Sequence, residues 1–301
     1  MKDYKHIEKR IKKKYHLTDD NIYYHKFYQD LFSGYSYVLG EKQDTRSFYT
    51  VEPKNCELRK ILKVNDTYSL CYGLEEIISS ALCHLAKSGK AYLYLEPKYK
   101  ENENGIENSE EKMLSELKLS EIVGYPRKRL FGKTVFYTLM FGGGVLKKEI
   151  ESKQLIVFDL QDMGYRKNTF YSIVSKLDKS DIMKSTKFIT EHVSEYDFPV
   201  HAKKERMKLL KLSRDFGWLW GTNGLSESYI LYKKIQQDKF QITFLSYAIK
   251  QINDGIKEFM QKDDTGEIVY HLRGLDYDRL WDDYTKGKKT MTELYNILYQ
   301  I

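Results

Sequence analysis

Several residues and sequence features are scarce in this chain of 301 residues. It has only four prolines, so long helices can run without interruption. The three cysteines, Cys56, Cys71 and Cys83, form no C-x-x-C pair, which indicates free thiols in a reducing, cytoplasmic compartment. No segment reaches the roughly 18 to 20 apolar residues needed to span a bilayer, and the charged N-terminus lacks the apolar core of a secretory signal. We therefore expect an intracellular protein without membrane contact.

Signatures of catalysis are also missing. Neither a phosphate-binding G-x-x-x-x-G-K-[ST] nor a nucleophile G-x-S-x-G occurs, and Gly142-Gly143-Gly144 lacks the Lys-Ser/Thr that would follow in a phosphate loop. The seven histidines are scattered singly and match no zinc spacing. The sequence therefore offers no catalytic residue, no metal ligand and no cofactor.

The residues that are present describe a globular, moderately basic protein. Hydrophobic residues make up 41% and charged residues 31%, and the net charge is +7. The positive charge is gathered in residues 1–14, which form a basic arm, and in two further clusters. Such clusters neutralise phosphates without reading base sequence, although solvated helix faces explain them too. The candidate nucleic-acid contacts are Arg127, Lys128, Arg129, Lys203, Lys204, Arg206 and Lys208.

Hydrophobic periodicity predicts a helix followed by strands in the first half of the chain. Apolar residues recur at steps of three and one over 73–88, which is typical of a helix with one buried stripe. Residues 91–96 alternate as in a strand, which we expect to end at Pro97. A turn at Gly142–Gly144 predicts a hairpin. The further strands are expected at Ser120–Tyr125, Thr134–Phe141 and Gln154–Leu160.

The second half reads as mostly helical. Helices are expected over 168–190, 202–220 and 290–301, with a strand over 267–272. The longest helix is expected near 225–262, where apolar residues follow heptad spacing. This seam is a candidate oligomer interface, and ordinary packing within one subunit is the alternative. Its residues are Ile242, Leu245, Ile249, Ile252, Ile256 and Phe259.

Strands and helices are thus segregated along the chain, which favours an α+β fold with a β-hairpin-rich block followed by a mostly helical C-terminal half. Three regions are expected. Residues 1–72 form a mixed N-terminal region with the basic arm, and residues 73–165 form a helix plus the β-rich block. Residues 166–301 form the helical region that contains the long helix.

One arrangement resembles the portal, or head–tail connector, proteins of tailed phages. It consists of the apolar helix from Gly73, the Gly89-Lys90-Ala91-Tyr92 segment that opens a strand, and the strand Leu155–Leu160 with Gly164 after it. In that family a similar helix ends at a Gly-x-Ala-Tyr strand, followed by a β-rich region and a helical half. The chain is short for a portal, and it lacks the usual Gly-x-Ser after the glycine.

The resemblance implies a structural subunit of a homo-oligomeric ring at one vertex of a phage capsid. Double-stranded DNA would pass through the ring, and terminase, capsid and adaptor proteins would dock on it. The protein would then be found in the cytoplasm of the host cell and in the virion. A ring of this kind needs heterologous interfaces that close.

Two other hypotheses stay open. A metal-dependent nuclease, or another DNA-processing protein of a mobile element or defence system, could combine Asp66 with Glu96 and Lys98, since carboxylates hold Mg²⁺ and a lysine polarises the attack. Pro97 between the last two argues against the required strand. The third hypothesis is a non-enzymatic protein-interaction module.

Overall fold

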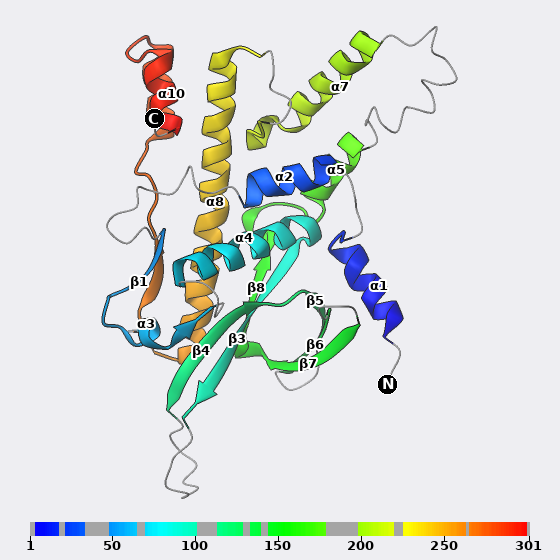
Figure 1. The fold of residues 1–301 in the computed structure, drawn as a ribbon, viewed down its shortest axis with the longest axis vertical. Coiled ribbons are helices and arrows are strands. Elements are labelled where there is room, and N and C mark those ends of the chain that lie inside the picture. Colours follow the sequence, from blue (N-terminus) through cyan, green and yellow to red (C-terminus); the bar gives the residue numbers. More distant parts are fainter. Residues whose placement is uncertain are drawn as a thin grey trace, which may run out of the picture. The chain divides into compact units, whose positions relative to one another are not determined.

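The computed structural model describes residues 4–17, 22–33, 48–64, 70–100, 113–128, 133–139, 144–178, 198–219, 225–262 and 265–299 (Figure 1). The chain divides into two compact units, each built from segments that are distant in sequence. Unit 1 contains Met1–Thr18, Glu41–Lys167 and Leu245–Leu272. Unit 2 contains Asp19–Gly40, Asn168–Phe244 and Arg273–Ile301.

Unit 1 holds the described strands. Its helices are α1 (Lys5–Lys14), α3 (Glu57–Ile61), α4 (Leu70–Ser88) and the second part of α8 (Glu227–Met260). One sheet has the order β2-β4-β3-β8, formed by Leu62–Lys63, Leu114–Glu121, Lys90–Tyr99 and Leu155–Asp159. A second sheet has the order β5-β6-β7, formed by Gly124–Lys128, Lys133–Leu139 and Val145–Glu151. The strands β1 (Tyr49–Glu52) and β9 (Glu267–Tyr270) pair separately.

The alternation of side chains along β3 organises unit 1 into layers. Tyr92 and Tyr94 point to one face, where they pack on Phe136 and Ile150 of the second sheet. Leu93 lies on the opposite face, across from Glu121 and Ile156. Glu121 bonds to side chains of α4, and Ile156 lies against Gly255 of α8. Two helices therefore cover one face of the first sheet, and the second sheet covers the other.

Two expectations about the strands were wrong. The strand β3 does not end at Pro97 but continues to Tyr99, with Pro97 opposite Leu117. Its pairing with β8 stops at Tyr94, so Pro97 lies where β3 has only one neighbour, and proline is tolerated at such an edge. The expected strand Ser120–Tyr125 is instead the end of β4 and the start of β5, in different sheets.

Other expectations were confirmed. The helix expected over 73–88 is α4, and Leu139 of β6 pairs with Val145 of β7, as the predicted hairpin requires. Most of that hairpin's turn, residues 140–143, lies outside the described residues. The fold is α+β, with the sheets of three or more strands in the first half of the chain and the 34-residue helix α8 in the second.

Unit 2 is helical. It contains α2 (Ile22–Phe32), α5 (Thr169–Asp178), α7 (Phe198–Leu212), the first part of α8, α9 (Tyr277–Thr285) and α10 (Met291–Tyr299). Residues 179–190 of the helix expected over 168–190 lie outside the described residues, and the helix expected over 202–220 ends at Leu212. Edge-to-face rings hold the core together, and the aromatic residues involved are Phe27, Phe32, Phe170, Phe216, Trp218, Phe240 and Phe244.

Among the described residues, no helix is both long enough and apolar enough to cross a membrane.

Candidate functional site

The basic arm of the sequence folds as α1 and docks on the second sheet of unit 1. Ile11 and Tyr15 are its anchors, at 0% and 1% exposure. The Tyr15 hydroxyl donates a hydrogen bond of 3.1 Å to the backbone oxygen of Gly124, at the start of β5. At the other end of α1, the rings of Tyr4 and Tyr137 lie 5.6 Å apart. The helix is therefore held at both ends over β5 and β6.

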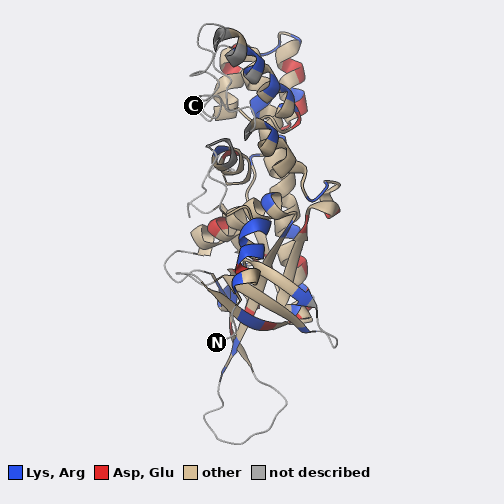
Figure 2. Cartoon of the chain, turned by 90° about the vertical axis from the view of Figure 1, so that its right-hand side faces the viewer, with Lys and Arg blue, Asp and Glu red and all other residues tan. Residues whose placement is uncertain are grey.

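Docking in this way turns the charged side of α1 outward and sets it beside basic residues of the strands (Figure 2). Arg127 of β5 and Lys133 of β6 are exposed, and they lie on the same face of the sheet as Tyr137. Positive groups that are far apart in the sequence are thus gathered on one surface, which we call the basic face. It consists of Lys5, Lys9, Arg10, Lys12, Lys13, Arg127 and Lys133.

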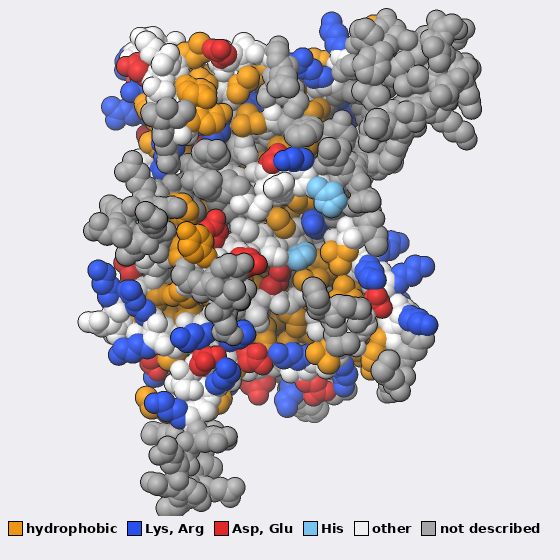
Figure 3. Space-filling model, in the orientation of Figure 1, with side chains coloured by type: hydrophobic (Ala, Val, Ile, Leu, Met, Phe, Trp, Pro, Cys, Tyr) orange, Lys and Arg blue, Asp and Glu red, His pale blue; other side chains and the backbone are white. Residues whose placement is uncertain are grey.

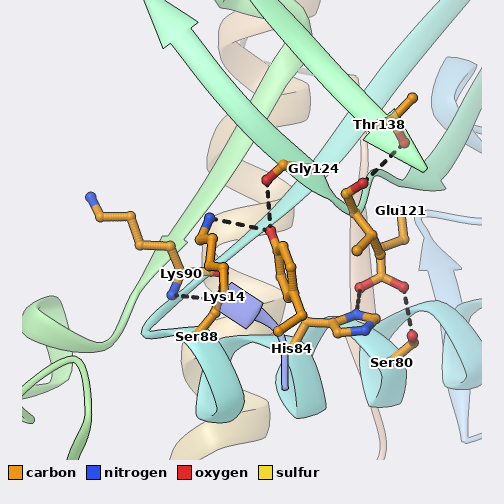
Figure 4. Close-up of polar contacts among 10 residues, drawn as sticks. Lys14, Ser80, His84, Ser88, Lys90, Glu121, Gly124 and Thr138 are labelled. Atoms are coloured by element: carbon orange, nitrogen blue, oxygen red, sulfur yellow. Dashed lines mark hydrogen bonds and ion pairs between the residues drawn. The ribbon is translucent and has the colours of Figure 1, made fainter. Parts of the chain in front are cut away.

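Three further lysines come together at the C-terminal end of α1. The amino group of Lys14 lies 3.3 Å from the Tyr15 hydroxyl (Figure 4). It also lies 5.0 Å from the centre of the Tyr92 ring. Burial, together with the charges of Lys90 and Lys167, lowers the pKa of Lys14 to about 8. Lys90 is paired with Asp159 at 2.5 Å.

The physical consequence is a local excess of positive charge. One carboxylate, Asp159, interacts with Lys90 and Lys167, while burial and then repulsion from these two lysines disfavour the charged form of Lys14. An anion placed near Lys14 would offset this repulsion and raise the pKa of Lys14. The cluster and the basic face are therefore suited to contact with a polyanion such as a nucleic-acid backbone.

A second polar group in the same region ties α4 to the sheet. The Glu121 carboxylate accepts a hydrogen bond of 2.5 Å from the Ser80 hydroxyl and contacts Nδ1 of His84 (Figure 4). The His84 ring packs edge-on against Tyr15, with centroids 5.2 Å apart. Although these residue types occur in catalytic triads, Ser80 bonds to the carboxylate and not to the imidazole. This arrangement fixes α4, β4 and α1 together and does not activate the serine.

The other predicted nucleic-acid contacts lie in β5, in α7 or outside the described residues. Lys128 lies in β5, and Arg129 lies outside the described residues. Lys203, Lys204 and Lys208 are exposed on α7 of unit 2, whereas Arg206 on the same helix is half-buried and one of its guanidinium nitrogens is buried. The structure thus joins the basic arm to Arg127 and places the α7 cluster in the other unit.

The heptad residues of α8 point into the protein. Leu245, Ile249, Ile252, Ile256 and Phe259 are exposed by 9% or less, and Ile242 is partly buried against the apolar cluster that α9 and α10 form with α8. These positions therefore contribute to packing within the chain, which was the alternative that the spacing left open. A role at an oligomer interface stays a prediction for them.

The residues of the nuclease hypothesis are used in surface ion pairs. Glu96 and Lys98 share a face of β3, where Glu96 lies 3.5 Å from Lys148 and Lys98 lies 2.9 Å from Glu116. Asp66 lies outside the described residues. Within the described part of the chain, no group of three or more His, Cys, Asp or Glu residues is placed to hold a metal ion.

Sequence reasoning missed the lysine cluster. Lys90 appeared only as a variable position between Gly89 and Ala91, and Lys167 belonged to no motif. Their proximity depends on the left-handed Gly89, where a Cβ would come within 3.0 Å of Lys167. The Gly-x-Ala-Tyr segment marked this turn, but no local pattern connected it with Lys14.

Comparison with known proteins gives a similarity of fold. No known family matches the sequence, and no curated protein does. Among solved structures, the chain is similar to one from the neck of a native gene transfer agent (GTA) particle, computed with C12 symmetry. The TM-score is 0.50 with 10% sequence identity, and the match covers 96% of this chain and 92% of the other. At this level of identity the match shows a likeness of fold.

Proposed function

We propose that this protein is a structural subunit of the neck of a phage-like particle and that it assembles into a closed homo-oligomeric ring of the portal type. The observation that carries the proposal is the extent of the fold match. It includes both units and nearly the whole of both chains, so the likeness is not confined to one common motif. The neighbour's particle neck has twelvefold symmetry, which is the arrangement that a heterologous, closing interface produces.

The basic face gives the second half of the proposal, which is contact with double-stranded DNA. Lysines and arginines that meet phosphates raise affinity without selecting a sequence, and their contacts weaken as salt screens them. A ring that conducts DNA needs this kind of contact because base-specific bonds would hold the DNA in place. Terminase, capsid and adaptor proteins are the partners that this function implies.

The proposed contact with DNA is tested by measuring the affinity of the protein for duplex DNA of mixed sequence. Reversing two exposed charges of α1, in Lys9→Glu with Lys13→Glu, should weaken binding and reduce the slope of log K against log salt by about 2. The same reversal in α7, Lys203→Glu with Lys204→Glu, is the matched comparison because it changes the net charge equally. A loss confined to the α7 variant would move the contact to unit 2, and binding unaffected by both would refute DNA contact through these clusters.

The ring half is tested by the mass and shape of the native particle at micromolar concentration. A ring of about a dozen subunits with a central hole supports the proposal. A monomer or dimer at every salt concentration contradicts it. The nuclease hypothesis predicts divalent-metal-dependent cleavage of DNA that is lost in Glu96→Ala.

A further inference from the structure

A groove lies in unit 2, between α7 and the beginning of α8, and α9 closes one end of it. Its volume is about 1180 Å³. Met207, Lys208, Leu210 and Lys211 of α7 form one wall, and Arg214 of the short turn after α7 continues it. Met207, Leu210 and Lys211 are spaced three and one apart, so they lie on one face of α7. The groove is independent of the basic face, which belongs to unit 1.

The opposite wall is aromatic. Tyr229 and Tyr232 come from α8 and Trp281 from α9. The rings of Tyr232 and Trp281 lie 5.1 Å apart, and those of Tyr229 and Tyr232 lie 6.4 Å apart. Each ring is held by its neighbour, which lowers the entropy cost of ordering it on binding. Hydrophobic side chains gather over this upper end of α8, with basic side chains beside them (Figure 3).

The groove is more apolar than an ordinary surface. Met207, at the edge of the groove, is 59% exposed. A methionine side chain is flexible and adapts its shape to apolar ligands. Rigid aromatic side chains opposite a flexible methionine are typical of protein-binding surfaces. An occupant that buries these groups must itself present a row of apolar side chains.

The charge of the groove is of one sign. Lys208 and Lys211 of α7 and Arg214 of the turn after it are exposed, and no Asp or Glu stands among the described residues that line the groove. Lys208 and Lys211 are neighbours three positions apart on α7, and a helical partner can present acidic residues three or four positions apart. The complementary surface is therefore apolar in the middle and acidic along one edge.

We propose that this groove binds an amphipathic helix of a partner protein, whose apolar stripe lies on the aromatic wall and whose Glu or Asp residues face Lys211 and Arg214. Two helix faces at an angle make the trough in which such a helix packs. A single nucleic-acid strand fits less well, because the aromatic rings contact one another and their faces are not all open for a base to stack.

The test uses the full-length protein and two labelled synthetic helices of about 20 residues, long enough to be helical in water. Both carry the same Leu/Phe stripe, and one has glutamates along its edge where the other has lysines. Fluorescence anisotropy should show that the Glu helix binds at least about tenfold more tightly than the Lys helix.

Charge reversal then separates recognition from folding. In the double variant Lys211→Glu with Arg214→Glu, the Glu helix should bind roughly tenfold more weakly and the Lys helix correspondingly better. A damaged fold would instead weaken the binding of both synthetic helices. The control, Lys203→Glu with Lys204→Glu, makes the same change on α7 outside the groove and should leave the preference intact.

Three results would overturn the proposal. The first is equal binding of both helices to the parent protein, which would remove the role of charge. The second is displacement of the Glu helix by an oligo-dT strand that itself binds more tightly, which would assign the groove to nucleic acid. The third is loss of self-assembly in the Lys211→Glu, Arg214→Glu variant, which would assign it to a second copy of this chain.

Discussion

Gly217 offers a sharp test of how unit 2 is packed. It follows the short turn Arg214–Phe216 and has a left-handed φ of 65°. A Cβ added there would come within 3.0 Å of the Lys233 carbonyl oxygen and the Gln237 backbone nitrogen, both in α8. Backbone atoms of a helix cannot rotate away as a side chain can. The absence of a side chain at Gly217 therefore sets how closely this turn approaches α8.

The cost of Gly217→Ala has two parts. The left-handed conformation costs about 1 to 2 kcal/mol for a residue with a Cβ, and overpacking against a rigid neighbour adds about 1 to 3 kcal/mol. The sum is about 2 to 5 kcal/mol, a large share of the ~5 to 15 kcal/mol that stabilises a domain. Trp218, which is fully buried and donates a 3.0 Å hydrogen bond to Asp30, would be displaced with the turn.

A matched control is available at Gly287 in the same unit. It has a similar φ of 71°, but no atom lies within 4 Å of its added Cβ. Gly287→Ala should therefore lose only the conformational part, about 1 to 2 kcal/mol. All three tryptophans lie in unit 2, so urea unfolding followed by tryptophan fluorescence reports on this unit. Equal losses in the two variants would refute the close approach to α8.

Other consequences concern buried polar groups. Burial lowers the pKa of Lys233 to about 8. The unfolded chain therefore binds more protons between pH 8 and 10.5, and stability should rise with pH in that window. Lys233→Met should be about 2 kcal/mol more stable at pH 7 and lose this rise, as urea unfolding at several pH values would reveal. Asp238 is fully buried beside Lys234, so Asp238→Ala should lower the free energy of unfolding by about 3 to 5 kcal/mol. A loss under 1 kcal/mol in the same assay would contradict this pairing. Tyr15→Phe should cost about 1 kcal/mol and speed amide exchange in α1, with exchange in α10 as the internal control.

Local patterns were enough to predict the strongest elements. The stripe of α4, the length of α8 and the β6–β7 hairpin each depend on neighbours within a few residues, and all three are present. The prediction that the strand ends at Pro97 was wrong because a proline interrupts a strand only where both neighbours are paired, and β8 does not extend that far beside β3. The extent of β8 is a property of the whole sheet, and the residues next to Pro97 in the sequence do not reveal it.

The candidate site was harder to predict because distant segments form it. The basic arm was visible in the sequence, but its position over β5 depends on the bond from Tyr15 to Gly124, 109 residues away. The groove of unit 2 likewise joins α7, α8 and Trp281. Charge clusters can be counted along a sequence, whereas the surface on which they meet is decided by the packing of the core.

The claim that this chain is a ring-forming neck subunit is tested most directly by measuring the mass of the native particle and imaging it in negative stain. We expect closed rings with a central hole and a mass near twelve times 35.8 kDa. Particles that remain monomers or dimers across protein and salt concentrations would contradict it.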